Sequence, residues 1–90
     1  MKVIFKYPCK SLVSNKHKLF LPVGAVVRHA DYLAGLCIWA EVDPKVKETE
    51  ERVFIIIETG ELFDSAGKIF INTILLDGTV WHIYEVKEGA

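Results

Sequence analysis

The chain has 90 residues, of which 51% are hydrophobic, and its eleven basic and twelve acidic residues give a formal net charge of −1. A chain this short folds as one domain with a modest core, so we expect a single β domain over residues 1–90. The near-neutral charge excludes a global field that would attract duplex nucleic acid, and no apolar run approaches the roughly 18 residues that span a bilayer. We therefore expect no duplex nucleic acid partner, no membrane partner and a cytoplasmic location.

Short β-prone runs follow one another along the chain, separated by proline, glycine and polar residues. Before the last third of the chain, these runs predict strands at 2–7, 17–21, 25–29, 36–42 and 52–59. The polar segment 11–15 is expected to be a loop. The charged connection 43–51 favours a long hairpin that pairs 36–42 with 52–59, and 59–67 is expected to be a crossover loop.

The strongest local signal is the Asp77-Gly78 pair between the β-prone runs 68–76 and 79–86. A two-residue Asp-Gly loop predicts a tight hairpin, because both loop positions need positive φ, and it also fixes the register of the two strands. The opposing pairs are then Leu76 and Thr79, Leu75 and Val80, Ile74 and Trp81, Thr73 and His82, Asn72 and Ile83, Ile71 and Tyr84, Phe70 and Glu85, and Ile69 and Val86.

Neither side of this hairpin is a polar face, whereas a small antiparallel sheet normally exposes one face to water. A ribbon that is apolar on both sides needs a second cover, and a subunit interface is one way to provide it. We therefore expect an all-β fold, a small antiparallel sandwich or partly open barrel of about six strands with a C-terminal Asp-Gly hairpin, that forms a homo-oligomer.

Three motifs, spread over nearly the whole chain, carry a family resemblance. They are Phe-Lys-Tyr-Pro at 5–8, Trp-Ala-Glu-Val-Asp-Pro at 39–44 and Trp-His-Ile-Tyr-Glu at 81–85. In these motifs the chain resembles a family of short tailed-phage and prophage proteins that have no assigned activity, although Asn72 stands where that pattern has glycine. The resemblance implies a small phage accessory protein in the host cell cytoplasm. By analogy, it suggests an oligomeric β module that traps a nucleotide-derived signal of host immunity.

Aromatic and basic side chains supply the candidate binding chemistry. Tryptophan and tyrosine rings can stack on a planar base, and lysine or arginine can neutralise a phosphate; Arg52 is a further cation of this kind. Core packing and solvated ion pairs, for example with Glu41, are the competing interpretations. The predicted ligand-binding residues are Lys6, Tyr7, Arg28, His29, Trp39, Trp81, His82 and Tyr84.

The histidines receive separate interpretations. Strand alternation places Arg28 and His29 on opposite faces, with His29 beside Ala25 and Val27 on an otherwise apolar side. For His82, a structural histidine with satisfied nitrogens is one interpretation, and a ligand contact at a pocket mouth is the other.

The chain lacks the local motifs of common catalytic and metal sites. Its histidines occupy separate segments, Cys9 and Cys37 have no Cys-x-x-Cys spacing, and there is no phosphate-binding glycine loop or nucleophile elbow. We expect no enzyme activity, no catalytic residues, no metal and no cofactor. Two hypotheses remain, which are a homo-oligomer that sequesters a small nucleotide-type ligand without cleaving it and a phage structural or protein-protein interaction module.

Overall fold

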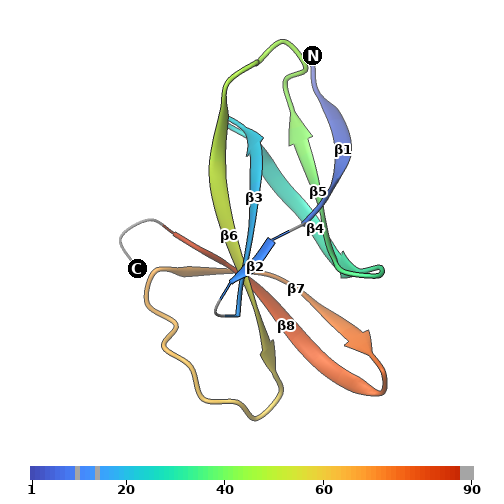
Figure 1. The fold of residues 1–90 in the computed structure, drawn as a ribbon, viewed down its shortest axis with the longest axis vertical. Helices are drawn as coiled ribbons and strands as arrows, with labels where there is room; N and C mark the ends of the chain where they lie inside the picture. Colours follow the sequence, from blue (N-terminus) through green and yellow to red (C-terminus); the bar gives the residue numbers. More distant parts are fainter. Residues whose placement is uncertain (10, 14, 88–90) are drawn as a thin grey trace.

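The computed structural model describes residues 1–9, 11–13 and 15–87, and regular structure in them consists of β-strands (Figure 1). The strands are β1 (Val3–Pro8), β2 (Ser11–Val13), β3 (Lys16–Pro22), β4 (Val26–Tyr32), β5 (Leu36–Val42), β6 (Thr49–Glu58), β7 (Lys68–Leu76) and β8 (Thr79–Val86). The all-β prediction is confirmed. Segment 11–15, expected to be a loop, instead contains the short strand β2, which pairs with the start of β3.

The strands form two antiparallel sheets that pack as a sandwich, with orders β1-β5-β4 and β2-β3-β6-β8-β7. The predicted hairpin between 36–42 and 52–59 is wrong, because β5 pairs with β1 and β4, whereas β6 pairs with β3 and β8. The connection 43–48 therefore crosses from one sheet to the other (Figure 1). Both strands are apolar at their centres. Each takes the central position in its own sheet, where an apolar strand is better protected from water than at an edge.

The C-terminal hairpin follows the predicted register from its turn to Asn72, which lies opposite Ile83. Asp77 and Gly78 both have positive φ, 51° and 77°, as an Asp-Gly loop requires. Beyond Asn72 the prediction is wrong. Ile71 is an additional residue in a β-bulge, so Phe70 lies opposite Tyr84 instead of Glu85. A bulge of this kind moves the following side chains to the other face of the strand.

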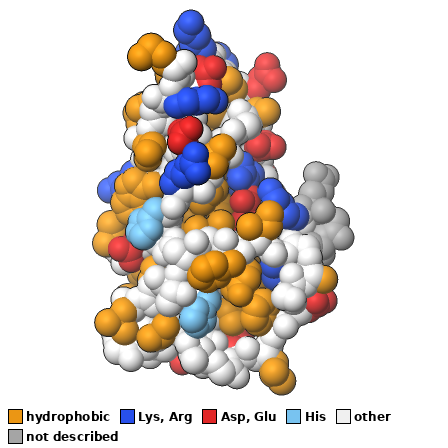
Figure 2. All heavy atoms as spheres, turned by 180° about the vertical axis from the view of Figure 1, so that it is seen from behind, with side chains coloured by type: hydrophobic (Ala, Val, Ile, Leu, Met, Phe, Trp, Pro, Cys, Tyr) orange, Lys and Arg blue, Asp and Glu red, His pale blue; other side chains and the backbone are white. Residues whose placement is uncertain are grey.

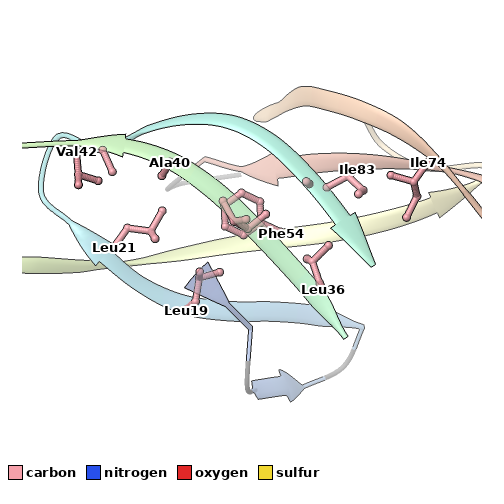
Figure 3. Packing of buried hydrophobic residues seen from close by; sticks show 11 residues of the cluster. Leu19, Leu21, Leu36, Ala40, Val42, Phe54, Ile74 and Ile83 are labelled. Atoms are coloured by element: carbon pink, nitrogen blue, oxygen red, sulfur yellow. The ribbon is translucent and has the colours of Figure 1, made fainter. Parts of the chain in front are cut away.

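One hydrophobic cluster fills the space between the two sheets. Phe54 of β6 lies near its centre, with Leu21, Ala40 and Val42 to one side and Ile74 and Ile83 to the other (Figure 3). Phe54, Ile38 and Ile83 are completely shielded from solvent. Because strand side chains alternate, the neighbours of these residues point to the outer faces of the sandwich.

The segment between β6 and β7 covers part of the outer face of the five-stranded sheet. Both strands run antiparallel to β8, which lies between them, so the connection must return along the length of β8. At one end, the Thr59 N–H donates to the Val80 carbonyl at 3.2 Å, and at the other the Lys87 N–H donates to the Gly67 carbonyl at 2.7 Å. This agrees with the predicted crossover loop. The chain thus provides part of the second cover that its apolar ribbon needs.

Large apolar side chains remain exposed on other parts of the surface. The relative exposure of Leu75 is 72%, that of Phe20 is 64% and that of Phe70 is 52%. Figure 2 shows hydrophobic side chains spread over the face turned away from the viewer in Figure 1. Within residues 1–9, 11–13 and 15–87, no helical segment has the length and hydropathy needed to cross a membrane.

Candidate functional site

The outer face of the three-stranded sheet collects four of the predicted binding residues. On β5, Ile38 and Ala40 point into the core with no exposed surface, so Trp39 between them points outward and is half-buried. Lys6 of β1 and His29 of β4 lie directly opposite Trp39 on its two sides. A row of Lys6, Trp39 and His29 therefore crosses the sheet, and the imidazole and indole centroids are 5.5 Å apart.

A β-bulge in β4 adds Arg28 to the same face. Val27 pairs with Ala40 and His29 pairs with Trp39, so Arg28 is an extra residue in the strand. Its Nε and Nη2 donate to Glu41 Oε1 at 3.1 and 3.0 Å. The prediction that Arg28 and His29 occupy opposite faces is wrong, because the bulge interrupts the alternation on which it depended. His29 is exposed, not beside Val27 on an apolar side.

Lys6, Arg28, His29 and Trp39 together form what we call the Trp39 face. Its two cations, Lys6 and Arg28, differ in how strongly other side chains hold them. The Arg28 and Glu41 side chains are 53% and 29% exposed, and surface pairs of this kind contribute about 0–1 kcal/mol. The Lys6 ammonium makes no ion pair or hydrogen bond with another described side chain. The face therefore offers a flat aromatic ring between an unpaired lysine and an arginine that can exchange its partner at little cost.

Tyr7 and Trp81 point into the sandwich instead. Tyr7 lies opposite Ile38 and packs against the core cluster, and its ring centroid is 6.5 Å from that of Phe5. Trp81 packs against the same cluster from β8, and its buried indole N–H has no hydrogen-bond partner among the described residues. Neither residue reaches the Trp39 face, so the core-packing interpretation describes both positions.

His82 lies on the outer face of the five-stranded sheet, where both of its ring nitrogens have partners. Nε2 is 2.8 Å from Thr59 Oγ1, and Nδ1 is 2.9 Å from Thr73 Oγ1. Thr59 Oγ1 also donates to the Val80 carbonyl at 3.2 Å, so the lone pairs of this hydroxyl remain available to accept a hydrogen bond from Nε2–H. Thr73 Oγ1 is in position to donate to Nδ1, so both ring nitrogens have a hydroxyl partner within the sheet. This geometry matches the interpretation of His82 as a structural histidine.

Tyr84 belongs to an aromatic cluster on that same outer face. Its ring centroid is 5.1 Å from Phe63 of the crossover loop and 5.5 Å from Phe70 of β7. The sequence pattern did not place either phenylalanine here. The Phe70 contact depends on the bulge at Ile71, and the Phe63 contact depends on the path of the loop. The predicted binding residues thus occupy three separate places, and only Lys6, Arg28, His29 and Trp39 lie together.

Arg52, the remaining predicted phosphate cation, is held in a mostly buried ion pair with Glu85. The guanidinium donates from Nε and Nη2 to the two Glu85 carboxylate oxygens, and Nη1 donates to the Ala25 carbonyl at 3.0 Å. The Arg52 and Glu85 side chains are 14% and 5% exposed. The hydrogen bonds to Glu85 raise the pKa of Arg52 above its ordinary value. Arg52 is therefore permanently charged and already paired.

His17 is a buried polar residue that the sequence pattern did not single out. It is 8% exposed, and its Nδ1 atom has no hydrogen-bond partner within the described part of the chain. Burial lowers the pKa of His17, and the Phe54 backbone offsets this only in part. In the same described residues, no group of three or more His, Cys, Asp or Glu side chains has the arrangement of a metal site.

Comparison with known families assigns the chain. A family model described as a domain of unknown function, DUF7352, matches residues 1–90. The chain belongs to the DUF7352 family. Comparisons with curated proteins and with solved structures found no match. Membership in DUF7352 gives no activity, so the function of the Trp39 face must be argued from its geometry.

Proposed function

We propose that this DUF7352 chain is a binding protein that holds a small nucleotide-type ligand on the Trp39 face and releases it unchanged. The observation that carries the proposal is the row of Lys6, Trp39 and His29, with Arg28 beside it. A base would stack on the exposed part of the indole, and base stacking contributes about 1–3 kcal/mol. The phosphate would lie against Lys6, or against Arg28 after exchange with Glu41.

Sequestration is the mechanism that fits such an open face. The protein would act by mass action, withdrawing the ligand from a competing receptor when its own concentration and affinity are high enough. A second copy of the chain against the Trp39 face would close the site and exclude water, which links the proposal to a homo-oligomer. In the phage setting that the sequence motifs suggest, the ligand would be a nucleotide-derived signal of host immunity, and the protein would reside in the host cytoplasm.

The experiment is a depletion and release assay. Purified protein is incubated with mononucleotides, cyclic nucleotides and ADP-ribose-type molecules, separated from free ligand, and heated so that the bound molecule can be identified. Intact recovered ligand supports sequestration, whereas a chemically altered product would indicate an enzyme. Failure to deplete any nucleotide-type molecule would reject the proposal.

Two variants locate the binding. Trp39→Leu should weaken binding by about tenfold or more, because it removes the stacking surface. Lys6→Ala should weaken binding of phosphate-bearing ligands, and Lys2→Ala is its control on the exposed start of the chain. Equal affinity of the Trp39→Leu variant and the unmodified protein would place the ligand elsewhere.

The alternative proposal is a phage structural or protein-protein interaction module. The observation that favours it is the exposed apolar outer face of β7, which carries the side chains of Leu75 and Phe70. An exposed apolar sheet face can dock onto another protein by surface complementarity. Stable capture of a phage or host protein, together with no ligand depletion, would favour this module over sequestration.

A further inference from the structure

A cleft lies where β8 ends beside the longer strand β6. The last β8 residue, Val86, pairs with Val53, whereas β6 begins four residues earlier at Thr49. Among the described residues, the first part of β6 therefore has only β3 as a strand neighbour. A cleft of about 810 Å³ opens there, within the range of small-ligand sites. Lys16, Lys18 and Lys87 line it, together with Arg52, Glu51 and Glu85.

The charges in this cleft do not cancel. Arg52 is committed to Glu85, and its Nη1 lies 3.6 Å from the remaining lining carboxylate, Glu50. None of the three lysine ammonium groups forms an ion pair with a described residue, and the Glu51 carboxylate has no ion-pair partner in the same set. Among the described lining residues, four positive charges thus face three negative ones, a net charge of +1, and the three lysines are the cations without an ion-pair partner.

The strand geometry spaces the three lysines around Val53 and Val86, two apolar residues that line the cleft. Lys16 and Lys18 are two residues apart on β3, so they share the outer face and their Cα atoms are separated by about 7 Å. Lys18 lies opposite Val53, which in turn lies opposite Val86, the residue before Lys87. Two strand spacings, about 10 Å, therefore separate Lys18 from the end of β8. Linked phosphate groups can contact the lysines while the three ammonium groups stay apart, whereas a single small anion would require these groups to converge against their mutual repulsion.

We propose that this cleft binds a small polyphosphate anion, a molecule with two or more linked phosphate groups. Lys16, Lys18 and Lys87 would contact the phosphates as point charges. The Arg52–Glu85 pair borders the cleft from the core side of the same sheet, because Arg52 lies opposite Leu19 and Glu85 lies opposite Phe54. The site is separate from the Trp39 face, because it lies on the five-stranded sheet and Trp39 lies on the three-stranded sheet. The proposal therefore does not depend on the proposed function.

The test is calorimetric titration of the full chain with sodium tripolyphosphate at low ionic strength. Replacing both lysines in Lys16→Ala/Lys18→Ala should weaken binding by about tenfold, and added salt should weaken binding to the unmodified protein. The matched control is Lys45→Ala/Lys47→Ala, which removes the same charge from the exposed connection between β5 and β6. The control and Trp39→Leu should each change the affinity by less than about twofold.

A further variant tests the sign of the charge argument without removing a lysine. Glu51→Gln neutralises the unpaired carboxylate at an exposed position, and it should tighten tripolyphosphate binding even if the double lysine variant does not fold. Equal weakening by the cleft and control variants, or unchanged affinity in Glu51→Gln, would overturn the site. So would binding of a short oligothymidylate without binding of tripolyphosphate, because that result would indicate a nucleic acid strand instead of a small polyphosphate.

Discussion

Asn72 of β7 hydrogen-bonds to both backbone groups of Ala30 in β4. The Ala30 N–H donates to Asn72 Oδ1 at 2.8 Å, and Asn72 Nδ2 donates to the Ala30 carbonyl at 2.9 Å. The two strands are edge strands of different sheets, and Ala30 is completely buried. The carboxamide thus provides hydrogen-bond partners for the buried N–H and carbonyl of Ala30, which point away from the neighbouring strand β5. In doing so, it joins the edge of one sheet to the edge of the other.

The first prediction follows from this contact. Asn72→Ala leaves a buried N–H and a buried carbonyl without partners, so the free energy of unfolding should fall by about 1–3 kcal/mol. Urea unfolding followed by tryptophan fluorescence measures the change. Asn72→Asp, which keeps an acceptor but loses the donor, should also destabilise the fold. An unchanged unfolding midpoint in Asn72→Ala would contradict the role given to this carboxamide.

The second prediction concerns the Arg52–Glu85 pair. Arg52→Met leaves the Glu85 carboxylate, which is 5% exposed, without its cation and should cost about 3–5 kcal/mol of stability. The double variant Arg52→Met/Glu85→Met should be less destabilised than the Arg52→Met single variant, because no buried charge is left unpaired. Denaturant unfolding of both variants provides the comparison.

The exposed pair of Arg28 and Glu41 provides the matched control for that comparison. Arg28→Met removes the same type of side chain from a solvated pair, so it should cost less than about 1 kcal/mol. Similar losses of stability in Arg28→Met and Arg52→Met would show that burial does not determine the strength of these pairs.

Local patterns in the sequence predicted the strands more successfully than their partners. The alternation of apolar residues and the Asp77-Gly78 turn predict the hairpin and its first five pairs, because both signals act between residues close in sequence. The partition of β5 and β6 into different sheets depends on contacts between distant residues. A strand that is apolar on both faces gives no information about which neighbour it will take.

The two β-bulges limited the prediction of the candidate site. The extra residue at Arg28 brings Arg28 and His29 to one face, and the extra residue at Ile71 moves Phe70 beside Tyr84. A bulge is set by the fit of two strands, so neither strand's own alternation reveals it. The choice of Lys6 and Trp39 as candidates rested on side-chain chemistry alone, and their proximity follows from the pairing of β1 with β5.

The third prediction tests the crossover loop as a cover for the ribbon. Phe63→Ala removes the ring that contacts Tyr84, so protease cleavage within 59–67 should become faster while the overall unfolding midpoint changes little. Leu62→Ala is the neighbouring control, because the Leu62 side chain is 97% exposed. Limited proteolysis with mass spectrometry distinguishes the variants. Equal cleavage rates in both would mean that the aromatic contact does not hold the loop.

The last prediction is a pH dependence of stability that arises from His17. Burial holds the pKa of His17 in the folded protein below 6.5, the ordinary value that applies to the unfolded chain, so the unfolded state binds a proton more readily. The stabilising contribution is therefore complete above that ordinary value and is lost as the pH falls through it toward the folded pKa. Below pH 6.5, the loss is at most about 1.4 kcal/mol per pH unit.

Replacing the histidine isolates this effect. In His17→Leu, the free energy of unfolding should depend less on pH between about pH 7.5 and 5.5, because no buried imidazole has to be protonated there. His29→Gln, at an exposed position, should keep the pH dependence of the unmodified protein. Urea unfolding at a series of pH values measures both variants. A His17→Leu profile that is as steep as that of the unmodified protein would assign the acid sensitivity to another group.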